Sequence, residues 1–449
     1  MKRKSEHIII VGAGLCGGLL ALRLAQRGYQ VSLYEMRGDM RLGEVDAGRS
    51  INLALSDRGL RALRLVGLEE RMIEECIPMH GRMIHSVEGE LRLSKYSGRQ
   101  EDFINSVSRS DLNRILIEEA DKHQDVSLYF DAKCTGIDIE NNEVTFDQNG
   151  KTITAKGDVI IGTDGAGSRV RREMLSHVSD ENKEDEAVFL SHGYKELSIP
   201  ATETGGWRID KNALHIWPRG EFMLIALPNL DGSFTVTLFL SYNDEVGFNH
   251  INSDEEIMSF FTTYFPDTLT HMPEIVKDYN DNPVGRLGTL KCFPWQHNGK
   301  LMIMGDAAHA IVPFYGQGMN ASFEDVFVFD ECLDKFDDDW QQVLPYYQKL
   351  RKPDTDAIAD LALDNFYEMR DHVDDKVFVK KRQIEMQLEQ TFPDYYSKYS
   401  LVTFNEHISY EQAMKQGRKQ DEILLELCRS GKAAEMSLEE IRQYISHYV

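Results

Sequence analysis

The chain of 449 residues has little of what marks membrane, secreted or nucleic-acid-binding proteins. No stretch approaches 18 consecutive apolar residues, so we expect no transmembrane helix. Positive charge is scarce, since 50 Lys and Arg stand against 74 Asp and Glu. The net charge of −24 argues against nucleic acid or an anionic membrane as a partner. An apolar content of 42% is nevertheless sufficient for a globular chain of two or three domains.

Cysteine is also rare, with six residues that lie far apart and form no CxxC pair. No spacing among Cys and His is typical of a zinc site, so we expect reduced thiols and no metal. The basic start at Lys2–Lys4 is followed by an apolar run that glycines interrupt, which argues against a signal peptide. We therefore predict a cytoplasmic, soluble protein. We leave its oligomeric state open between a monomer and a homodimer.

A dinucleotide-binding pattern occupies the first 35 residues. Residues 8–11 are all apolar and predict a buried strand, and the residues after Gly14 have helical spacing. Gly12 allows a tight turn between strand and helix, Gly14 lets a pyrophosphate approach the backbone, and Gly17 allows close packing. The helix N-terminus attracts the phosphates, and Glu35 can accept hydrogen bonds from a ribose diol. The pattern predicts a bound dinucleotide and leaves its identity open.

Two later loops also follow short apolar strands. In the first, Asp164 precedes a helix and has two interpretations, a helix cap or a second contact with the dinucleotide. In the second, Asp306 can bind a ribose or ribityl hydroxyl. The helix that begins near Gly318 can direct the positive end of its dipole at an anionic ring edge. The glycine density of this second loop favours a ligand site over an ordinary turn.

The order of these three motifs resembles that of the single-component FAD-dependent aromatic hydroxylases. No second GxGxxG unit is present, in agreement with a family in which NADPH has no domain of its own. The resemblance implies an α/β fold, with a Rossmann-like FAD-binding domain, a β-sheet substrate domain and a helical C-terminal region. It also implies that an aromatic ring is hydroxylated with NADPH and O2 through a C4a-hydroperoxyflavin.

The domain division follows from this resemblance and from the charged stretch at 181–186, which we interpret as a boundary loop. We expect four short strands between residues 126 and 155 to form one small meander. The amphipathic, charged tail at 418–449 predicts packing on the body or on a partner, and no membrane anchor. The predicted parts are an FAD-binding domain at 1–76, 102–182 and 283–330, a β-rich substrate domain at 77–101 and 183–282, and a helical region at 331–449.

A narrower resemblance, carried by residues 77–85, 214–218 and 309–321, is to members of this family whose substrate is an aromatic amino acid. An arginine suits the substrate carboxylate, because its planar guanidinium can form two parallel hydrogen bonds. The substrate-binding residues that the resemblance implies are Arg82, Tyr96, Asn365 and Tyr399. The FAD-binding residues from the motifs and the resemblance are Gly12, Gly14, Leu15, Gly17, Glu35, Arg37, Ala54, Arg109, Asp164, Asp306, Gly318, Met319 and Asn320.

The resemblance also places Tyr315 and Gln317 near the isoalloxazine ring. We assign no catalytic base, because an amino group on the substrate ring already supplies electrons to it. Two other functions remain open, a flavin hydroxylase of a different aromatic acid and a flavin-binding reductase or binding protein that does not activate oxygen. The identity of the aromatic compound that accelerates flavin reduction would reveal a hydroxylase of a different acid. NADPH-dependent oxygen uptake would distinguish both hydroxylases from a reductase or binding protein.

Overall fold

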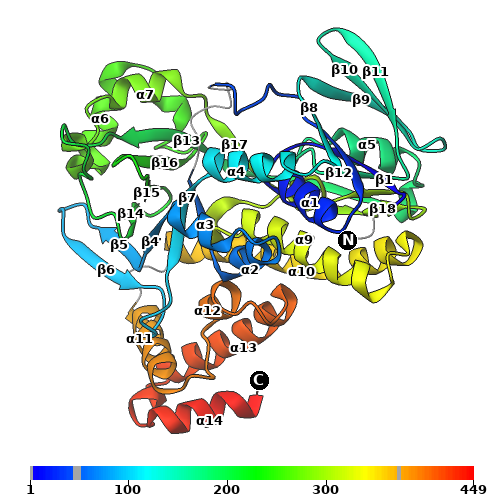
Figure 1. Ribbon diagram of the computed structural model, residues 1–449. Coiled ribbons are helices and arrows are strands. Elements are labelled where there is room, and N and C mark those ends of the chain that lie inside the picture. The colour runs from blue at the N-terminus through cyan, green and yellow to red at the C-terminus, as the bar shows by residue number, and fades with distance from the viewer. Residues whose placement is uncertain (1–3, 44–51, 372–375, 449) are drawn as a thin grey trace.

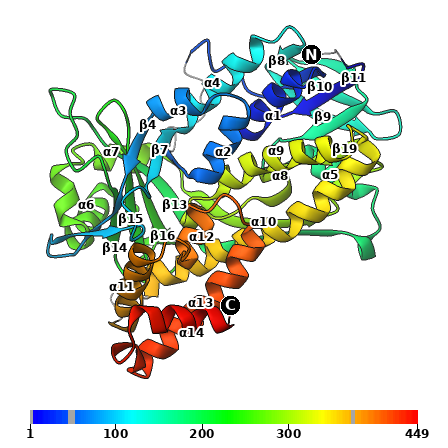
Figure 2. The same cartoon turned by 60° about the horizontal axis from the view of Figure 1, so that its bottom comes forward.

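The computed structural model describes residues 4–43, 52–371 and 376–448. Residues 2 and 3, on which part of the signal-peptide expectation depends, lie outside these ranges. Two large sheets lie next to each other, and the last helices of the chain pack beneath them (Figure 1). Turning the molecule shows these helices at the end away from strands β10 and β11 (Figure 2).

The first large sheet has six strands, and β1 lies at its centre between two parallel neighbours. Three successive isoleucines of β1 are completely buried, because helices cover the sheet and leave neither side of the strand to water. In spatial order the strands are β18 (Gln296–His297), β19 (Leu301–Ile303), β12 (Val159–Gly162), β1 (His7–Val11), β2 (Gln30–Tyr34) and β8 (Val126–Tyr129).

Helix α1 packs on both α4 and α9 beside this sheet, and α2 packs on α9. The buried leucines of α1 belong to the same hydrophobic core as the isoleucines of β1. This core fixes the turn between β1 and α1, where the dinucleotide pattern lies. The helices of this part are α1 (Leu15–Gln26), α2 (Asp57–Leu65), α3 (Glu69–Glu74), α4 (Arg109–Asp121), α5 (Arg169–Ser176), α8 (Asp306–His309) and α9 (Gly318–Lys335).

The prediction of one four-stranded meander was wrong in its first strand. Strand β8 pairs with β2 in the parallel sheet, because α4 packs against α1 and returns the chain to the free edge of β2. The other three strands do form a meander, β9 (Ala132–Asp138), β10 (Glu143–Gln148) and β11 (Lys151–Lys156). Another small sheet contains β3 (Asn52–Leu55), β7 (Ile104–Ser108) and β4 (Cys76–Met79).

The second large sheet has seven strands and is covered on one side by α6 (Asp254–Tyr264) and α7 (Ile275–Asp281) (Figure 1). Tightly packed aromatic and aliphatic side chains join these helices to the strands. In spatial order the strands are β17 (Gly285–Phe293), β13 (Glu184–Ile199), β16 (Phe234–Ser241), β15 (Met223–Pro228), β14 (Leu214–Pro218), β5 (Gly81–His85) and β6 (Leu91–Lys95).

The boundary loop expected at 181–186 is partly a strand, since β13 begins at Glu184. Its charges are paired with cations from other elements. Asp185 lies 3.1 Å from Arg171, and Glu184 lies 3.1 Å from Lys352. These ion pairs allow a charged segment to join a sheet. Strand β13 also pairs with β17, which forms an edge of the seven-stranded sheet. The residues of β17 fall within the range that we expected for the FAD-binding domain.

The C-terminal part is helical, and its long helix α10 contacts both α9 and α13. Leucines and isoleucines of the last helices form a core of their own, so the tail packs on α11. Within the described ranges, no helix combines the length and apolarity needed to cross a membrane. The helices are α10 (Trp340–Asp371), α11 (Lys376–Thr391), α12 (Lys398–Thr403), α13 (Tyr410–Arg429) and α14 (Leu438–Tyr448).

Candidate active site

The glycines of the dinucleotide pattern have three different structural roles. Gly12 adopts a φ of 104°, and a Cβ there would lie 2.5 Å from the carbonyl oxygen of Thr163. A Cβ at Gly17 would lie 2.0 Å from the carbonyl oxygen of Gly12, so only glycine permits this close packing. A Cβ at Gly14 would meet nothing within 4 Å, and no side chain caps the N-terminus of α1 there. The structure thus leaves open space beside free N–H groups, where a pyrophosphate fits.

Glu35 fixes the backbone beside this space. Its side chain is buried, and its Oε2 accepts a hydrogen bond of 2.9 Å from the amide of Ala13. Its Oε1 accepts from the amide and the Nε of Arg37, at 3.0 and 2.8 Å. A carboxylate offers about four acceptor positions, so Glu35 retains capacity for a ribose hydroxyl. Leu15, in the first turn of α1, is 9% exposed.

Asp306 and Arg109 lie near each other, and both side chains are exposed. The surrounding protein raises the pKa of Asp306, and the Arg109 guanidinium partly offsets that increase. Because solvent reaches the Asp306 carboxyl, the hydroxyl group of a ligand can also reach it. Asp164 has a different arrangement, because its Oδ2 accepts from the amides of Arg169 and Val170 at 2.6 and 3.2 Å. This matches the helix-cap interpretation of Asp164.

Asn320 connects the first turn of α9 to strand β3. Its Nδ2 donates to the carbonyl oxygens of Ala54 at 2.8 Å and Gly316 at 2.9 Å, and its Oδ1 accepts from the amide of Ser56 at 3.0 Å. Neighbouring Met319 is 9% exposed. No side chain caps α9, which begins at Gly318, so its first N–H groups can face an anionic ligand.

The predicted substrate residues Arg82, Tyr96 and Tyr399 lie together, although 317 positions separate the first from the last. The guanidinium of Arg82 lies 4.8 Å from the ring centre of Tyr399 and 5.6 Å from that of Tyr96. The two tyrosine rings stack at 5.7 Å, and Tyr399 stacks on Tyr315 at 5.5 Å. The structure therefore forms a cationic group against a stack of three phenol rings.

Several polar atoms in this group have no partner among the described residues. Arg82 Nε and the hydroxyls of Tyr96 and Tyr315 are buried without a hydrogen bond, and no carboxylate of the described residues forms an ion pair with Arg82. Burying such groups is unfavourable unless a ligand satisfies them. The walls around them are apolar and include Met79, Ile104, Leu227 and Phe404. The arrangement suits an aromatic molecule that carries a carboxylate.

Asn365, the fourth predicted residue, lies on α10 and is buried. Its Nδ2 donates a hydrogen bond of 2.6 Å to the carbonyl oxygen of Phe314. Gln317 is 2% exposed, and its Oε1 accepts 2.9 Å from the hydroxyl of Tyr410. The candidate flavin-ring segment is therefore held from the C-terminal helices.

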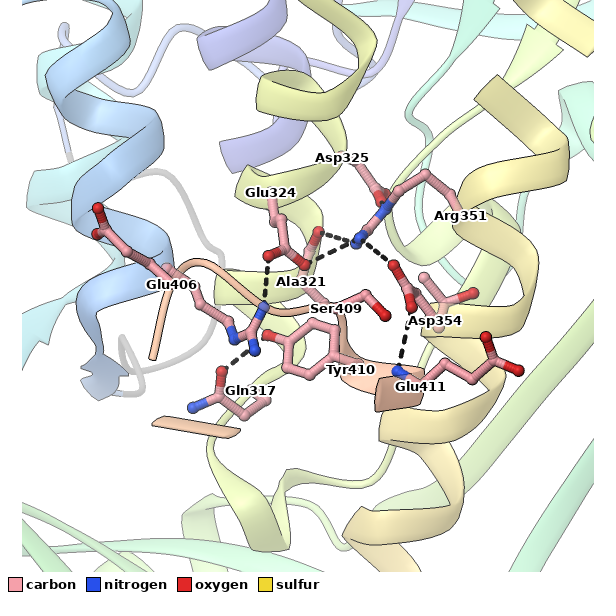
Figure 3. A network of polar contacts seen from close by, with 12 residues as sticks. Gln317, Ala321, Glu324, Asp325, Arg351, Asp354, Glu406, Ser409, Tyr410 and Glu411 are labelled. Atoms are coloured by element: carbon pink, nitrogen blue, oxygen red, sulfur yellow. Dashed lines mark hydrogen bonds and ion pairs between the residues drawn. The ribbon is translucent and has the colours of Figure 1, made fainter. Parts of the chain in front are cut away.

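A buried ionic network behind α9 was absent from our predictions (Figure 3). Arg351 lies 2.9 Å from Glu324, 2.8 Å from Asp325 and 3.4 Å from Asp354. Arg58 approaches Glu324 within 2.6 Å. Burial alone would raise the pKa of Glu324, but the two arginines outweigh it and hold that pKa below its usual range.

The same network supports the loop that carries Asp306. Asp325 Oδ2 accepts from the amide of Gly305 at 3.0 Å and lies 2.5 Å from His309 Nε2. Adjacent acids at 324 and 325 in a helix look like a solvated face in the sequence, so no local signal identified them. Within 4–43, 52–371 and 376–448, no group of three or more His, Cys, Asp or Glu side chains is placed to hold a metal ion.

The fold agrees with two comparisons. Residues 5–353 match the model of the FAD binding domain family. The tetrameric form of 2-methyl-3-hydroxypyridine-5-carboxylic acid oxygenase has a TM-score of 0.68 at 18% identity, covering 88% of this chain and 99% of that chain. P. aeruginosa PqsL, in complex with 2-aminobenzoylacetate, has a TM-score of 0.65 at 18% identity, covering 82% of this chain and 97% of that one. The class is that of the FAD-dependent aromatic monooxygenases.

Relatives at higher identity define the class further. The kynurenine 3-monooxygenase of Myxococcus xanthus is 43% identical over 435 residues, 96% of this chain and 93% of that protein. The enzyme of the same name from Dictyostelium discoideum is 43% identical over 438 residues, and that from Legionella pneumophila (strain Corby) 39% over 445. These alignments cover 95% and 99% of this chain, and 94% and 98% of those proteins. The chain belongs to the kynurenine 3-monooxygenase family.

Replacing Gly14 with valine will weaken FAD binding about tenfold or more, a loss of about 1.4 kcal/mol. A Cβ at this position would meet nothing within 4 Å, so we expect the variant to fold and its side chain to occupy the open space beside α1. Titration of the apoprotein with FAD, followed by flavin fluorescence, measures the dissociation constant. Gly136→Val on β9 is the matched control, because a Cβ there also meets nothing within 4 Å. Equal affinity in both variants would contradict a pyrophosphate position at Gly14.

A buried histidine pair holds β5, which carries Arg82, to β14. His85 Nε2 lies 2.8 Å from His215 Nδ1, and His215 Nε2 lies 2.7 Å from the carbonyl oxygen of Asp210. Burial lowers the pKa of His215 to about 4. In the unfolded chain this imidazole binds a proton near pH 6.5, so the unfolded state binds more protons between about pH 6.5 and 4.

We therefore expect the free energy of unfolding to fall by up to about 3 kcal/mol from this group as the pH drops through that window. Urea unfolding at several pH values between 7 and 4 measures it. His215→Gln should flatten this dependence, whereas His407→Gln, at an exposed position, should not. An unchanged slope in His215→Gln would show that this imidazole does not titrate differently on unfolding.

Proposed function

We propose that this protein hydroxylates L-kynurenine at ring position 3 to give 3-hydroxy-L-kynurenine, a step of tryptophan degradation. The reaction consumes NADPH, a proton and O2, and it releases NADP+ and water. Bound FAD supplies the transfer of electrons from NADPH to dioxygen. The names of the relatives support this substrate, and so does the site at Arg82.

The observation that carries the proposal is the Arg82 side chain among Tyr96, Tyr399 and Tyr315, with its Nε buried and without a hydrogen bond to any described residue. Kynurenine joins an aromatic ring to an α-amino acid, and its carboxylate can satisfy the guanidinium with two parallel hydrogen bonds. The stacked phenol rings bound the same space, and Tyr96 and Tyr315 offer hydroxyl groups that lack a partner. Placing one end of the substrate in this way orients the rest.

The protein's other contribution is to exclude water and to hold the substrate still. The apolar walls formed by Met79, Leu227 and Phe404 limit access of solvent to the ring. The aniline nitrogen of the substrate donates electrons to the carbon that is hydroxylated, so the reaction requires no strong protein base. We accordingly propose Tyr315 and Gln317 as neighbours of the flavin ring and Asn365 as part of the opposite side of the substrate site. Tyr399, which we also expected on that side, lies instead beside Arg82 and Tyr96.

The remaining predictions form part of the same proposal. FAD would contact the residues named for it, and the three domains would have the limits predicted above, except that β17 belongs to the sheet of the β-rich substrate domain. A cytoplasmic location is supported by the six free cysteines, five of them buried. A homodimer is one of two states that light scattering of the purified protein would distinguish.

Anaerobic mixing of the purified holoenzyme with NADPH, with and without L-kynurenine, tests the function. Kynurenine should accelerate the loss of the oxidised flavin absorbance, and admission of air should yield 3-hydroxykynurenine. Acceleration by a different aromatic acid alone would indicate another hydroxylase. Flavin reduction without coupled oxygen uptake or hydroxylated product would indicate a reductase. Either of these results would overturn the proposal.

A further inference from the structure

The flavin loop, defined here as residues 313–317, is contacted by the C-terminal helices at three positions. Asn365 of α10 donates to the carbonyl oxygen of Phe314, and Tyr399 of α12 stacks on Tyr315. Tyr410, the first residue of α13, donates to Oε1 of Gln317. Our predictions included Asn365 and Tyr399 but not Tyr410. Tyr410 contacts Gln317, the residue directly before α9.

Tyr410 is itself fixed on both sides. Its side chain is fully buried, and the guanidinium of Arg58 lies 4.1 Å from its ring centre. Arg58 in turn donates to the carbonyl oxygen of Val402 at 2.7 Å and pairs with Glu324 at 2.6 Å. Figure 3 shows Tyr410 between the ionic network and Gln317. The phenol therefore has one orientation available to it, with its hydroxyl directed at the flavin loop.

The direction of this hydrogen bond determines the orientation of the Gln317 amide. Burial raises the pKa of Tyr410 far above neutrality, so the hydroxyl keeps its proton and remains a donor. Because the Tyr410 hydroxyl donates, it faces the amide oxygen of Gln317, and the N–H2 group of Gln317 points away from Tyr410. Among the described residues, that N–H2 group has no hydrogen-bond partner. It is consequently available to a ligand at the flavin loop.

We propose that Tyr410 is a positioning residue, which holds Gln317 and the flavin loop in place. In this way the oxidation of each NADPH leads to hydroxylation of one substrate molecule. The inference rests on the proposed function. With the loop loosened, water enters and part of the turnover becomes NADPH, a proton and O2 giving NADP+ and hydrogen peroxide. In that side reaction O2 takes up both electrons of NADPH and two protons, and the substrate is unchanged. Tyr410 touches neither substrate nor reacting atoms in this role.

Tyr410→Phe removes only the hydroxyl, and the ring under Arg58 remains. In the holoenzyme we expect the ratio of 3-hydroxykynurenine to NADPH consumed to fall about threefold or more, with hydrogen peroxide accounting for the difference. The KM for kynurenine should change by less than about twofold, because the substrate contacts are intact. Tyr347→Phe is the matched control, since that hydroxyl is buried without a hydrogen bond. It should leave the ratio unchanged.

Amide hydrogen exchange of residues 314–318 in the holoenzyme gives a readout that needs no turnover. Exchange there should accelerate about threefold or more in Tyr410→Phe and not in Tyr347→Phe. In addition, the double variant Tyr410→Phe with Gln317→Leu should form as much 3-hydroxykynurenine per NADPH consumed as Gln317→Leu alone.

Additive losses in the double variant, equal changes in both tyrosine variants, or unchanged exchange in Tyr410→Phe would each overturn the inference. If the wild-type enzyme forms no 3-hydroxykynurenine, the proposed function fails, while the exchange experiment still decides whether Tyr410 positions the loop.

Discussion

Replacing Arg82 with alanine is expected to lower kcat/KM for L-kynurenine about 100-fold, which corresponds to about 2.7 kcal/mol. Most of this change should appear as a higher KM, because the guanidinium binds the carboxylate equally before and during hydroxylation. The structure favours a large effect, since no protein carboxylate pairs with Arg82 in the described ranges and its Nε is buried without a partner. Steady-state kinetics with varied kynurenine measures the effect.

Arg92→Ala is the matched control for that experiment. Arg92 is exposed on β6, the strand next to the one that carries Arg82, so its loss should leave KM unchanged. The visible absorbance of bound flavin should be the same in both variants. Arg82→Lys should recover only part of the affinity, because an ammonium group cannot form two parallel hydrogen bonds. An unchanged KM in Arg82→Ala would remove Arg82 from the substrate site.

Replacing Arg351 with methionine should lower the free energy of unfolding by about 4 kcal/mol at neutral pH. Arg351 is 1% exposed and is shared by the buried carboxylates of Glu324, Asp325 and Asp354. Methionine replaces the apolar stem of arginine but leaves these charges without their cation. Urea unfolding followed by circular dichroism measures the change.

The exposed Arg64 provides the control, because its pairs with Glu69 and Glu406 are largely solvated. Arg64→Met should cost no more than about 1 kcal/mol. In the wild type, His309 and Arg351 outweigh burial and hold the pKa of Asp325 below its usual range. The ion pairs of Asp325 therefore stabilise the fold at a pH above the ordinary pKa of an aspartate. This stabilisation is lost as the pH falls through the lowered pKa of Asp325 in the folded protein. Equal losses in Arg351→Met and Arg64→Met would contradict the importance of the buried network.

The nucleotide part of the fold could be predicted because its determinants are adjacent in the chain. Gly12, Gly14 and Gly17 follow an apolar strand directly, and each has the backbone role that the pattern requires. The FAD-binding fold and the class of enzyme are confirmed by the family match. Glu35 was also identified from its distance along the chain, and it lies beside the turn.

The parts that could not be predicted depend on contacts between distant segments. Nothing local in residues 126–129 shows that α4 delivers them to the edge of β2. Nothing local distinguishes Arg58 and Glu324 from surface residues, although 266 positions separate them and both are buried. Arg82 and Tyr399 were found by resemblance, since their spacing carries no periodic signal. Tyr410 has neither a motif nor a repeat to mark it.

The stack of tyrosines also has a consequence for the order in which the enzyme is assembled. The residues proposed to hold FAD end at Asn320, whereas Tyr399 and Tyr410 come from helices synthesised later. A chain emerging from the ribosome would therefore contain every residue proposed to hold FAD before the last residues proposed for the substrate site. Until α12 and α13 dock, Arg82 lacks the ring of Tyr399 beside it, and Gln317 lacks the hydrogen bond from Tyr410. We therefore expect docking of these last helices to complete both the proposed substrate site and the support of the flavin loop.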